Sequence, residues 1–235
     1  PDDAIRSVAE RMSEEKTDFR EKVFGHFSGS LSSEVLSPLQ EKGASTFSLH
    51  PAQSFSDPAV AIQNLPKTVF TAEGTTGYET VLSELFHGFP NCVLRIEASV
   101  KVKYHAAMVM LSNYLATLYA LSEEMLQGIG MSSEDSSALL VPLLDSTAHN
   151  LREKGFQALT GPLKRGDGRT VEKHLLALQD QPTVFRLYRL LAEETVRLLA
   201  IERGEDESLE NMRSLIKQWK ERGDGYEESH HQNIP

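Results

Sequence analysis

Two histidines stand where short apolar stretches of the sequence end. His26 follows "EKVFG" and precedes "FSGS", and His50 follows "STFSL" and precedes "PAQS". An imidazole can take up or release a proton near neutral pH, and small residues beside it let a ligand approach the backbone. Because parallel sheets bind ligands beyond the carboxyl ends of their strands, two such strand ends predict one side of a cleft. The other interpretation is that each histidine is a partly buried side chain with satisfied hydrogen bonds.

A second set of polar residues lies on a long helical pattern. Lys101 and His105 are four residues apart and share a helix face, with Ser112 near that face two turns later and Asn113 beside it. Lysine, histidine and asparagine side chains can polarise a carbonyl group or transfer a proton beside a hydride acceptor. Alternatively, Lys101 is solvated at the helix start while His105 and Asn113 form hydrogen bonds between helices.

The stretch "LTGPLKRGDGRTVEKHL" is a third candidate. Its glycines and proline predict a tight connection, and Asp167 or Thr170 can cap the following helix. Lys164 and Arg165 could bind an anion there, but exposed basic residues are also common in ordinary turns.

Composition excludes several classes of protein. A net charge of −10 over 235 residues argues against nucleic acid or an anionic membrane as the main partner. Cys92 is the single cysteine, which excludes an intramolecular disulfide or a cysteine-based zinc site and fits a reducing cytoplasm. The histidine spacings predict no metal site. The start "PDDAIRSVAERMSEEK" does not resemble a signal peptide, and the apolar run "AAMVMLSNYLATLYAL" is short enough to predict a buried helix rather than a membrane span.

The elements that position these residues follow two different patterns. In the first part helical and strand-like segments alternate, which predicts parallel β-α units with a sheet covered on both faces. The expected strands are 21–27, 44–49, 67–74 and 91–96, and the expected helices are 2–15, 32–43, 57–65 and 77–89. The second part predicts helices only, at 99–127, 132–155, 168–180, 182–204 and 207–222. The fold class is therefore α/β followed by all-α, with domains 1–97 and 98–222 and a disordered tail at 223–235.

Four stretches together resemble one family. They are "HFSGSLSSEVL", "GASTFSLHPAQSF", "KVKYHAAMVMLSNYL" and "LTGPLKRGDGRTVEKHL". They resemble uncharacterised Rossmann-like oxidoreductases with a C-terminal helical domain of unknown function, which are similar to NADP-dependent enzymes of the pyrroline-carboxylate and ketopantoate reductase type. The match extends from residue 1 to about 200. It implies a nucleotide-binding domain, a helical domain that mediates dimerisation, and an active cleft between the two.

One part of the family pattern is missing. Such proteins begin with a strand, a Gly-x-Gly-x-x-Gly turn and a helix whose N-terminus holds the pyrophosphate. The sequence has no such turn, and "PDDAI" resembles the end of the family's fourth strand. We therefore expect a partial Rossmann-like parallel sheet and weak or no binding of NADPH by this chain alone. The chain is either a fragment or a natural truncation.

The resemblance implies an NADP-dependent oxidoreductase that acts on a small carbonyl or imine compound. It places three groups of residues at the cleft: His26, Ser28 and Gly29 beside the nicotinamide, His50 and Gln53 beside the substrate, and Lys101, His105 and Asn113 as catalytic residues on the long helix. A second hypothesis is a non-catalytic module that forms a homodimer through its apolar helices. A third is a flavin- or deazaflavin-dependent enzyme of related fold.

Overall fold

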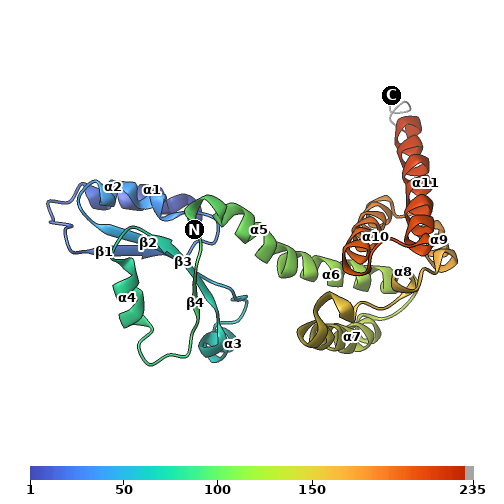
Figure 1. Cartoon of the computed structure of the whole chain (residues 1–235), viewed down its shortest axis with the longest axis horizontal. Coiled ribbons are helices and arrows are strands. Elements are labelled where there is room, and N and C mark those ends of the chain that lie inside the picture. Colours follow the sequence, from blue (N-terminus) through green and yellow to red (C-terminus); the bar gives the residue numbers. More distant parts are fainter. Residues whose placement is uncertain (231–235) are drawn as a thin grey trace. The chain divides into compact units, whose positions relative to one another are not determined.

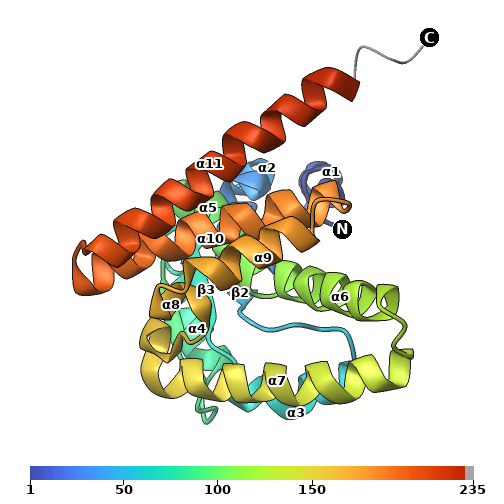
Figure 2. The same cartoon turned by 90° about the vertical axis from the view of Figure 1, so that its right-hand side faces the viewer.

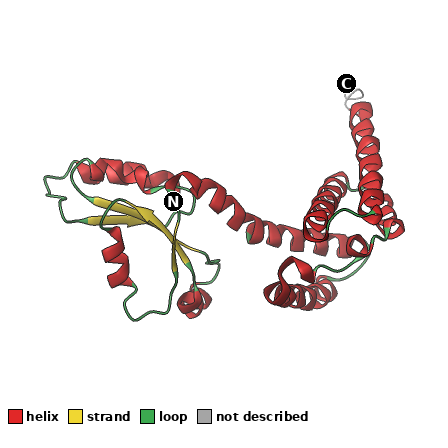
Figure 3. Ribbon diagram, in the orientation of Figure 1, coloured by secondary structure: helices red, strands yellow, loops and turns green. Residues whose placement is uncertain are grey.

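The structure is a computed structural model that describes residues 1–230. It forms two compact units, one from Pro1 to Tyr119 and one that begins at Ala120. Within the described residues, every strand belongs to the first unit and the second unit is helical (Figure 3). The predicted order of an α/β part followed by an all-α part is confirmed.

The first unit alternates helices and strands along the chain (Figure 1). Its elements are α1 Asp2–Ser13, β1 Val23–His26, η1 Ser33–Leu36, α2 Ser37–Gln40, β2 Ser45–Pro51, α3 Pro58–Asn64, η2 Leu65–Lys67, β3 Phe70–Gly74, α4 Tyr78–Leu85, β4 Val93–Arg95, η3 Ala98–Val100, α5 Lys101–Leu111 and the first part of α6 Asn113–Gly128.

The four strands form one sheet in the order β1-β2-β3-β4. β1 pairs with β2 and β3 pairs with β4 in parallel, but β2 and β3 are antiparallel. The expectation of an all-parallel sheet is therefore wrong at this one pairing. The reason is that the chain reverses direction after β2, so that β3 runs back along it. A hydrogen bond from the Ala52 amide to the Val69 carbonyl (2.9 Å) joins the two ends of this connection.

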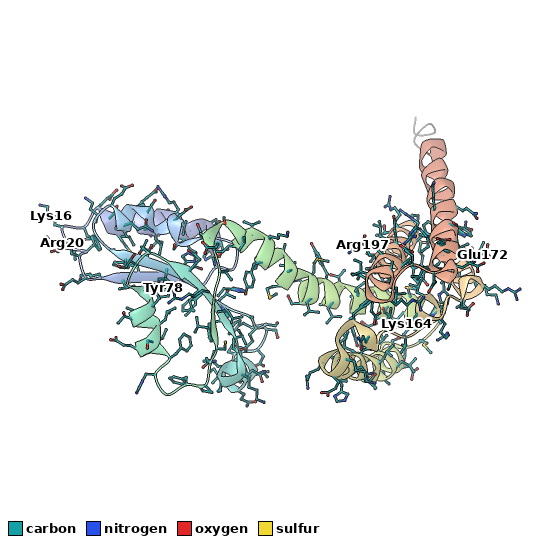
Figure 4. The ribbon with its side chains drawn as sticks, in the orientation of Figure 1. Lys16, Arg20, Tyr78, Lys164, Glu172 and Arg197 are labelled. Carbon is teal, nitrogen blue, oxygen red and sulfur yellow. The ribbon has the colours of Figure 1, made fainter. Side chains whose placement is uncertain are left out.

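One face of the sheet is apolar. The strand residues on this face pack against Tyr78 and Leu82 of α4; they are Phe47, Leu49, Phe70 and Ala72. Tyr78, labelled in Figure 4, stacks on Phe47 with ring centroids 6.3 Å apart. The alternation of "STFSL" thus directs every second side chain into this core.

The opposite face carries polar side chains that are nevertheless buried. The register places His26 beside Ser48 and Ser48 beside Glu73, with His50 opposite Thr71 one step further along. The helix layer above this face has its own apolar core of Ala9, Phe19, Leu36, Leu39 and Ala44, contributed by α1, α2 and the segments next to them. Helices thus cover both faces of the sheet, as the sequence predicts.

The helical pattern expected over 99–127 is interrupted at Ser112, which separates α5 from α6. The Ser112 hydroxyl donates a hydrogen bond to the Met108 carbonyl one turn earlier (2.8 Å). Such bonds from serine to the preceding turn bend helices. One continuous helix was predicted because the prediction rested on the spacing of the apolar residues alone.

The second unit continues α6 and adds α7 Ser133–Lys154, η4 Gly155–Ala158, α8 Pro162–Arg165, α9 Gly168–Ala177, α10 Pro182–Arg203 and α11 Glu207–His230. Figure 2 shows α9, α10 and α11 side by side. Their apolar faces form one core, whose fully buried members are Val171, Leu175, Val196, Leu199, Leu209 and Met212. The regular helical spacing of these residues is the reason that the sequence predicted the three helices.

The last strand ends at Arg95, before the expected domain boundary at residue 97, while the first compact unit continues to Tyr119. Residues 223–230 belong to α11, where a disordered tail was expected, and residues 231–235 lie outside the described part. Across residues 1–230, no helix combines the length and apolarity that crossing a bilayer requires.

Candidate functional site

Lys101, the first residue of α5, is buried against the polar face of the sheet. Its ammonium donates hydrogen bonds to the Ser48 hydroxyl (2.7 Å) and the Ser28 carbonyl (3.3 Å), and only 1% of the residue is exposed. The alternative in which Lys101 is solvated is therefore wrong. Lys101 instead attaches α5 both to β2 and to the loop after β1.

Glu73 on β3 is the counter-charge of Lys101. Its Oε1 lies 3.9 Å from the Lys101 Nζ, and its two carboxylate oxygens accept hydrogen bonds from the Ser33 amide and hydroxyl (2.8 Å each). Burial lowers the pKa of Lys101, and the negative charges of Glu73 and Asp2 act in the opposite direction. The pair is thus a buried charge centre beside Ser48, two residues before His50 on β2.

The loop after β1 is held by its own serines. The Ser28 hydroxyl donates to the Asp2 carboxylate at the start of α1 (2.6 Å) and accepts the amides of Ser30 (3.3 Å) and Leu31 (3.0 Å). The Ser48 hydroxyl donates to the Ser28 carbonyl (3.1 Å), which joins this loop to β2. The position of Gly29 is therefore fixed from both sides.

Gly29 lies against two imidazole rings. A Cβ at this position would be 2.4 Å from the His105 Cδ2 and 2.8 Å from the His50 Nε2 and Cδ2, so only glycine leaves room for both rings. The rings themselves meet edge to face, with centroids 5.7 Å apart. The structure thus brings Gly29, His50 and His105 together, with His26 on the parallel neighbour of the strand that carries His50.

The environment of His50 includes a residue that the sequence interpretation did not select. The His50 Nδ1 is 2.9 Å from the Tyr104 hydroxyl, and the two rings meet edge to face. Burial lowers the pKa of His50, and the positive charges of His105 and Lys101 lower it further, while Asp2 opposes the shift. His50 therefore favours the neutral form at neutral pH.

The ring nitrogens of His26 are both engaged within its own loop. Nε2 donates to the Ser32 carbonyl and Nδ1 accepts the Ser28 amide, each at 3.2 Å. Burial is the main cause that lowers the pKa of this residue. This geometry agrees with the interpretation of His26 as a satisfied, buried histidine; its contact with a cofactor stays a prediction.

Two of the expected site residues have other partners. Gln53 donates to the Ala61 carbonyl (3.0 Å) and accepts a hydrogen bond from the Thr68 hydroxyl, so it closes the connection between β2 and β3. Asn113 is exposed at the start of α6, and its Oδ1 accepts a hydrogen bond from the Ser112 hydroxyl (2.8 Å). Neither residue forms a hydrogen bond with His50 or His105 in the described structure. Their functional roles stay predictions.

The basic turn of the second unit is occupied by local contacts. Lys164 of α8, labelled in Figure 4, forms an ion pair with Glu202 of α10 (3.3 Å). Asp167 caps α9 by accepting the Thr170 amide (3.1 Å), as the sequence suggested. Within the described residues, no three histidine, cysteine or acidic side chains come close enough to hold a metal ion.

The sequence interpretation missed Glu73, Tyr104 and Asp2. An acidic residue within the strand pattern "VFTAEG" is a signal in itself, because a carboxylate on a covered strand needs a buried partner. Tyr104 carried no comparable signal, since aromatic residues are common on any helix that packs.

Comparison with known proteins extends this description. Residues 68–195 match a family described as a domain of unknown function, DUF2520, over more than half of the chain. The chain belongs to the DUF2520 family. The DUF2520 match includes Glu73, Lys101, Tyr104 and His105, and it covers parts of both compact units. No functionally curated protein matches the sequence.

Several solved structures are similar to this DUF2520 chain. TM1727 from Thermotoga maritima is 27% identical, with a TM-score of 0.71 over 86% of this chain and 77% of its own. BF3122 from Bacteroides fragilis, a candidate NADP oxidoreductase, is 24% identical, with a TM-score of 0.66 over 83% of this chain and 72% of its own. Pyrroline carboxylate reductase from Plasmodium falciparum, solved with NADP bound, is 12% identical, with a TM-score of 0.51 over 91% and 77%. At these identities the last two show the fold alone, and that fold is the Rossmann-like one expected from the sequence.

Proposed function

We propose that this DUF2520 chain belongs to an NADP-dependent oxidoreductase that reduces or oxidises a small carbonyl or imine compound. The observation that carries the proposal is the group formed by Gly29, His50 and His105 above the buried pair of Lys101 and Glu73. The descriptions of BF3122 as a candidate NADP oxidoreductase and of the Plasmodium falciparum enzyme as an NADP-bound reductase support the same reaction class.

The residues present fit the reactive end of such a cofactor. Gly29 lets the loop after β1 lie directly against the rings of His50 and His105, at a strand end where the backbone of Ser28 and Gly29 could lie beside a flat nicotinamide ring. The sequence contains no Gly-x-Gly-x-x-Gly turn for the pyrophosphate. We therefore assign the nicotinamide side of the site to this chain and expect its affinity for the whole dinucleotide to be weak.

The histidines supply the proton chemistry. Bound in its reduced form, NADP supplies a hydride, and the oxygen or nitrogen of the substrate must then gain one proton. The half-buried ring of His105, on the catalytic helix, is the group placed to hold that proton, and the neutral ring of His50 lies beside it on the substrate side. Lys101 is completely buried, so its contribution is the positive charge that it places beneath the rings.

The other assignments remain parts of the proposal. Asn113 as a catalytic residue and Gln53 as a substrate contact require substrate to reach residues that now bond elsewhere. The exposed free thiol of Cys92 fits a reducing compartment, and we place the protein in the cytoplasm. No observation favours a flavin or deazaflavin over NADP.

Reduced nicotinamide mononucleotide is the sharpest probe, because it lacks the adenylate half that this chain has no turn to bind. We expect it to shift the NMR signals of His50 and His105 at concentrations that leave the exposed His149 on α7 unchanged. A His105→Gln variant should weaken this response, and a His149→Gln variant should not. Equal shifts at all three histidines, or none at the two rings, would contradict the proposal. A panel of small carbonyl and imine compounds with NADPH then tests turnover.

A second candidate function, a module that forms a homodimer, is favoured by the exposed apolar helices. Val102, Met110 and Leu111 on α5 are each at least two-thirds exposed, at 70%, 67% and 69%. Among the 22 residues of α7 only Ser136 is buried, and Leu143 is 62% exposed. Apolar surface of this extent marks an interaction site, and a second copy of the chain is the partner that we propose.

Light scattering over a concentration series tests this association. We expect a dimer at micromolar concentration and a shift toward monomer in Leu143→Glu. Val60→Glu on α3, an apolar position in the other unit that is 53% exposed, is the matched control. A strictly monomeric wild-type chain would exclude the module hypothesis.

A further inference from the structure

We propose that Tyr104 is a positioning residue that holds the His50 ring with its proton on Nε2, so that His50 offers the substrate a hydrogen-bond donor. This inference rests on the proposed function only for the identity of the substrate. The arrangement itself is a property of the free protein.

The start of α5 determines where Tyr104 lies. Lys101 is fixed by its bonds to Ser48 and Ser28, and Tyr104 follows three residues later, on the same side of the helix. Its hydroxyl therefore reaches the His50 Nδ1 at 2.9 Å, and the rings meet edge to face at 5.6 Å and 83°. A short bond and a ring contact together fix both the position and the tilt of the imidazole.

Nε2 is the nitrogen of the His50 ring that is left for a ligand. The ring is half-buried, and its Nε2 and Cδ2 edge lies beside Gly29. In the part of the chain that the structure describes, the hydrogen bond that this ring forms is the one at Nδ1. Nε2 is thus the nitrogen that can bond to a substrate reaching the exposed part of the ring.

The tautomer follows from the hydrogen-bonding capacity of each group. A neutral imidazole has one donor nitrogen and one acceptor nitrogen, and a phenol hydroxyl can fill either role. Burial and the nearby positive charges lower the pKa of His50, so the neutral ring dominates near pH 7. An O–H group is most effective as a donor to an imidazole lone pair, which assigns the acceptor role to Nδ1 and the proton to Nε2.

Other charged groups surround the ring and must be considered in any titration. They are Asp2 from α1, Lys101 and His105 from α5, and His26 and Glu73 on the same face of the sheet. Tyr104 differs from all of these because it bonds to the ring itself. Removing its hydroxyl therefore changes the balance between the Nδ1–H and Nε2–H tautomers of His50 without changing any nearby charge.

The consequence for substrates is a preference for hydrogen-bond acceptors. An N–H group on Nε2 can bind a carbonyl oxygen, a carboxylate or an unprotonated imine nitrogen, but it repels a protonated amine. The structure thus favours carbonyl or neutral imine substrates over ammonium compounds at this position. Tyr104 would enforce that preference without touching the substrate.

NMR of the ¹⁵N-labelled full chain, without cofactor or substrate, tests the inference. His50→Gln identifies the His50 signals, and two-bond ¹H–¹⁵N correlations then report which ring nitrogen carries the proton. We expect the Nε2–H tautomer above the pKa of His50. In Tyr104→Phe the neutral ring loses the donor that keeps its proton on Nε2, a hydrogen bond worth about 1 kcal/mol, so the ratio of the Nδ1–H to the Nε2–H tautomer should rise by about fivefold.

The matched control is Tyr114→Phe, an exposed tyrosine of α6, which should leave the tautomer ratio of His50 unchanged. An unchanged tautomer ratio in Tyr104→Phe, or an Nδ1–H tautomer in the wild type, would overturn the inference. If the Tyr104→Phe variant does not fold, the tautomer of His50 in the wild-type protein still tests the inference. Because the readout needs no cofactor, failure of the proposed reaction and failure of this inference are distinguishable.

Discussion

Replacing Gly29 by alanine should disturb the candidate site through sterics alone. The φ angle of Gly29 lies outside the left-handed region, so alanine is compatible with its backbone. The new Cβ would lie 2.4 Å from the His105 Cδ2 and 2.8 Å from the His50 Nε2, where ordinary contact begins at 3.4 Å. The two rings must therefore move by 1.0 Å (3.4 − 2.4) and 0.6 Å (3.4 − 2.8).

The energetic cost follows from what holds each ring. Overpacking a well-packed position costs about 1–3 kcal/mol. Both rings are partly exposed and can shift toward solvent, so the lower half of that range applies, and we expect a loss of roughly 1–2 kcal/mol in the free energy of unfolding. The movement of His50 also disturbs the geometry of its 2.9 Å bond to Tyr104, which should become visible in the NMR spectrum of that histidine.

Two measurements check this prediction. Denaturant unfolding gives the change in stability, and NMR of the histidine rings reports the local displacement. Gly128→Ala is the matched control, because no atom lies within 4 Å of a Cβ at that position. If Gly29→Ala unfolds within about 0.5 kcal/mol of the wild type and leaves both histidine spectra unchanged, the contact of Gly29 with the two rings is refuted.

Three further predictions concern the buried polar face. Lys101→Met leaves the carboxylate of Glu73 buried without its counter-charge and should lower the free energy of unfolding by about 3 kcal/mol. The double variant with Glu73→Gln should recover part of that loss in the same denaturation assay. Thr71→Val removes a buried hydroxyl that has no hydrogen-bond partner among the described residues, and the variant should be more stable by about 1 kcal/mol. A loss of similar size in calorimetry would instead mean that the hydroxyl is satisfied. The pKa values of His26 and His50 are lowered from 6.5, so their contribution to stability is complete above pH 6.5 and is lost as the pH falls through the folded values. Unfolding free energies measured across that window should fall by up to about 1.4 kcal/mol per pH unit for each histidine, and a flat profile would exclude the shifts.

The sequence by itself determined the positions of the helices and strands, and it determined the end of the sheet at which the two histidines lie. Strand and helix positions follow from local spacing of apolar residues, and the structure confirms nearly all of them. His26 and His50 share one edge because β1 and β2 are parallel neighbours, a relation that the intervening helix makes the default. The helical repeat likewise placed Lys101 and His105 on one side of α5.

Only the tertiary structure decided what these residues contact. The antiparallel pairing of β2 with β3 brings Glu73 beside Ser48, and this places a counter-charge where Lys101 is buried. Strand direction depends on how a long connection packs, and the spacing of apolar residues is the same in either direction. For the same reason the bond between Tyr104 and His50 could not be read from the chain. It joins groups 54 positions apart, and its existence depends on the docking of α5 rather than on any local pattern.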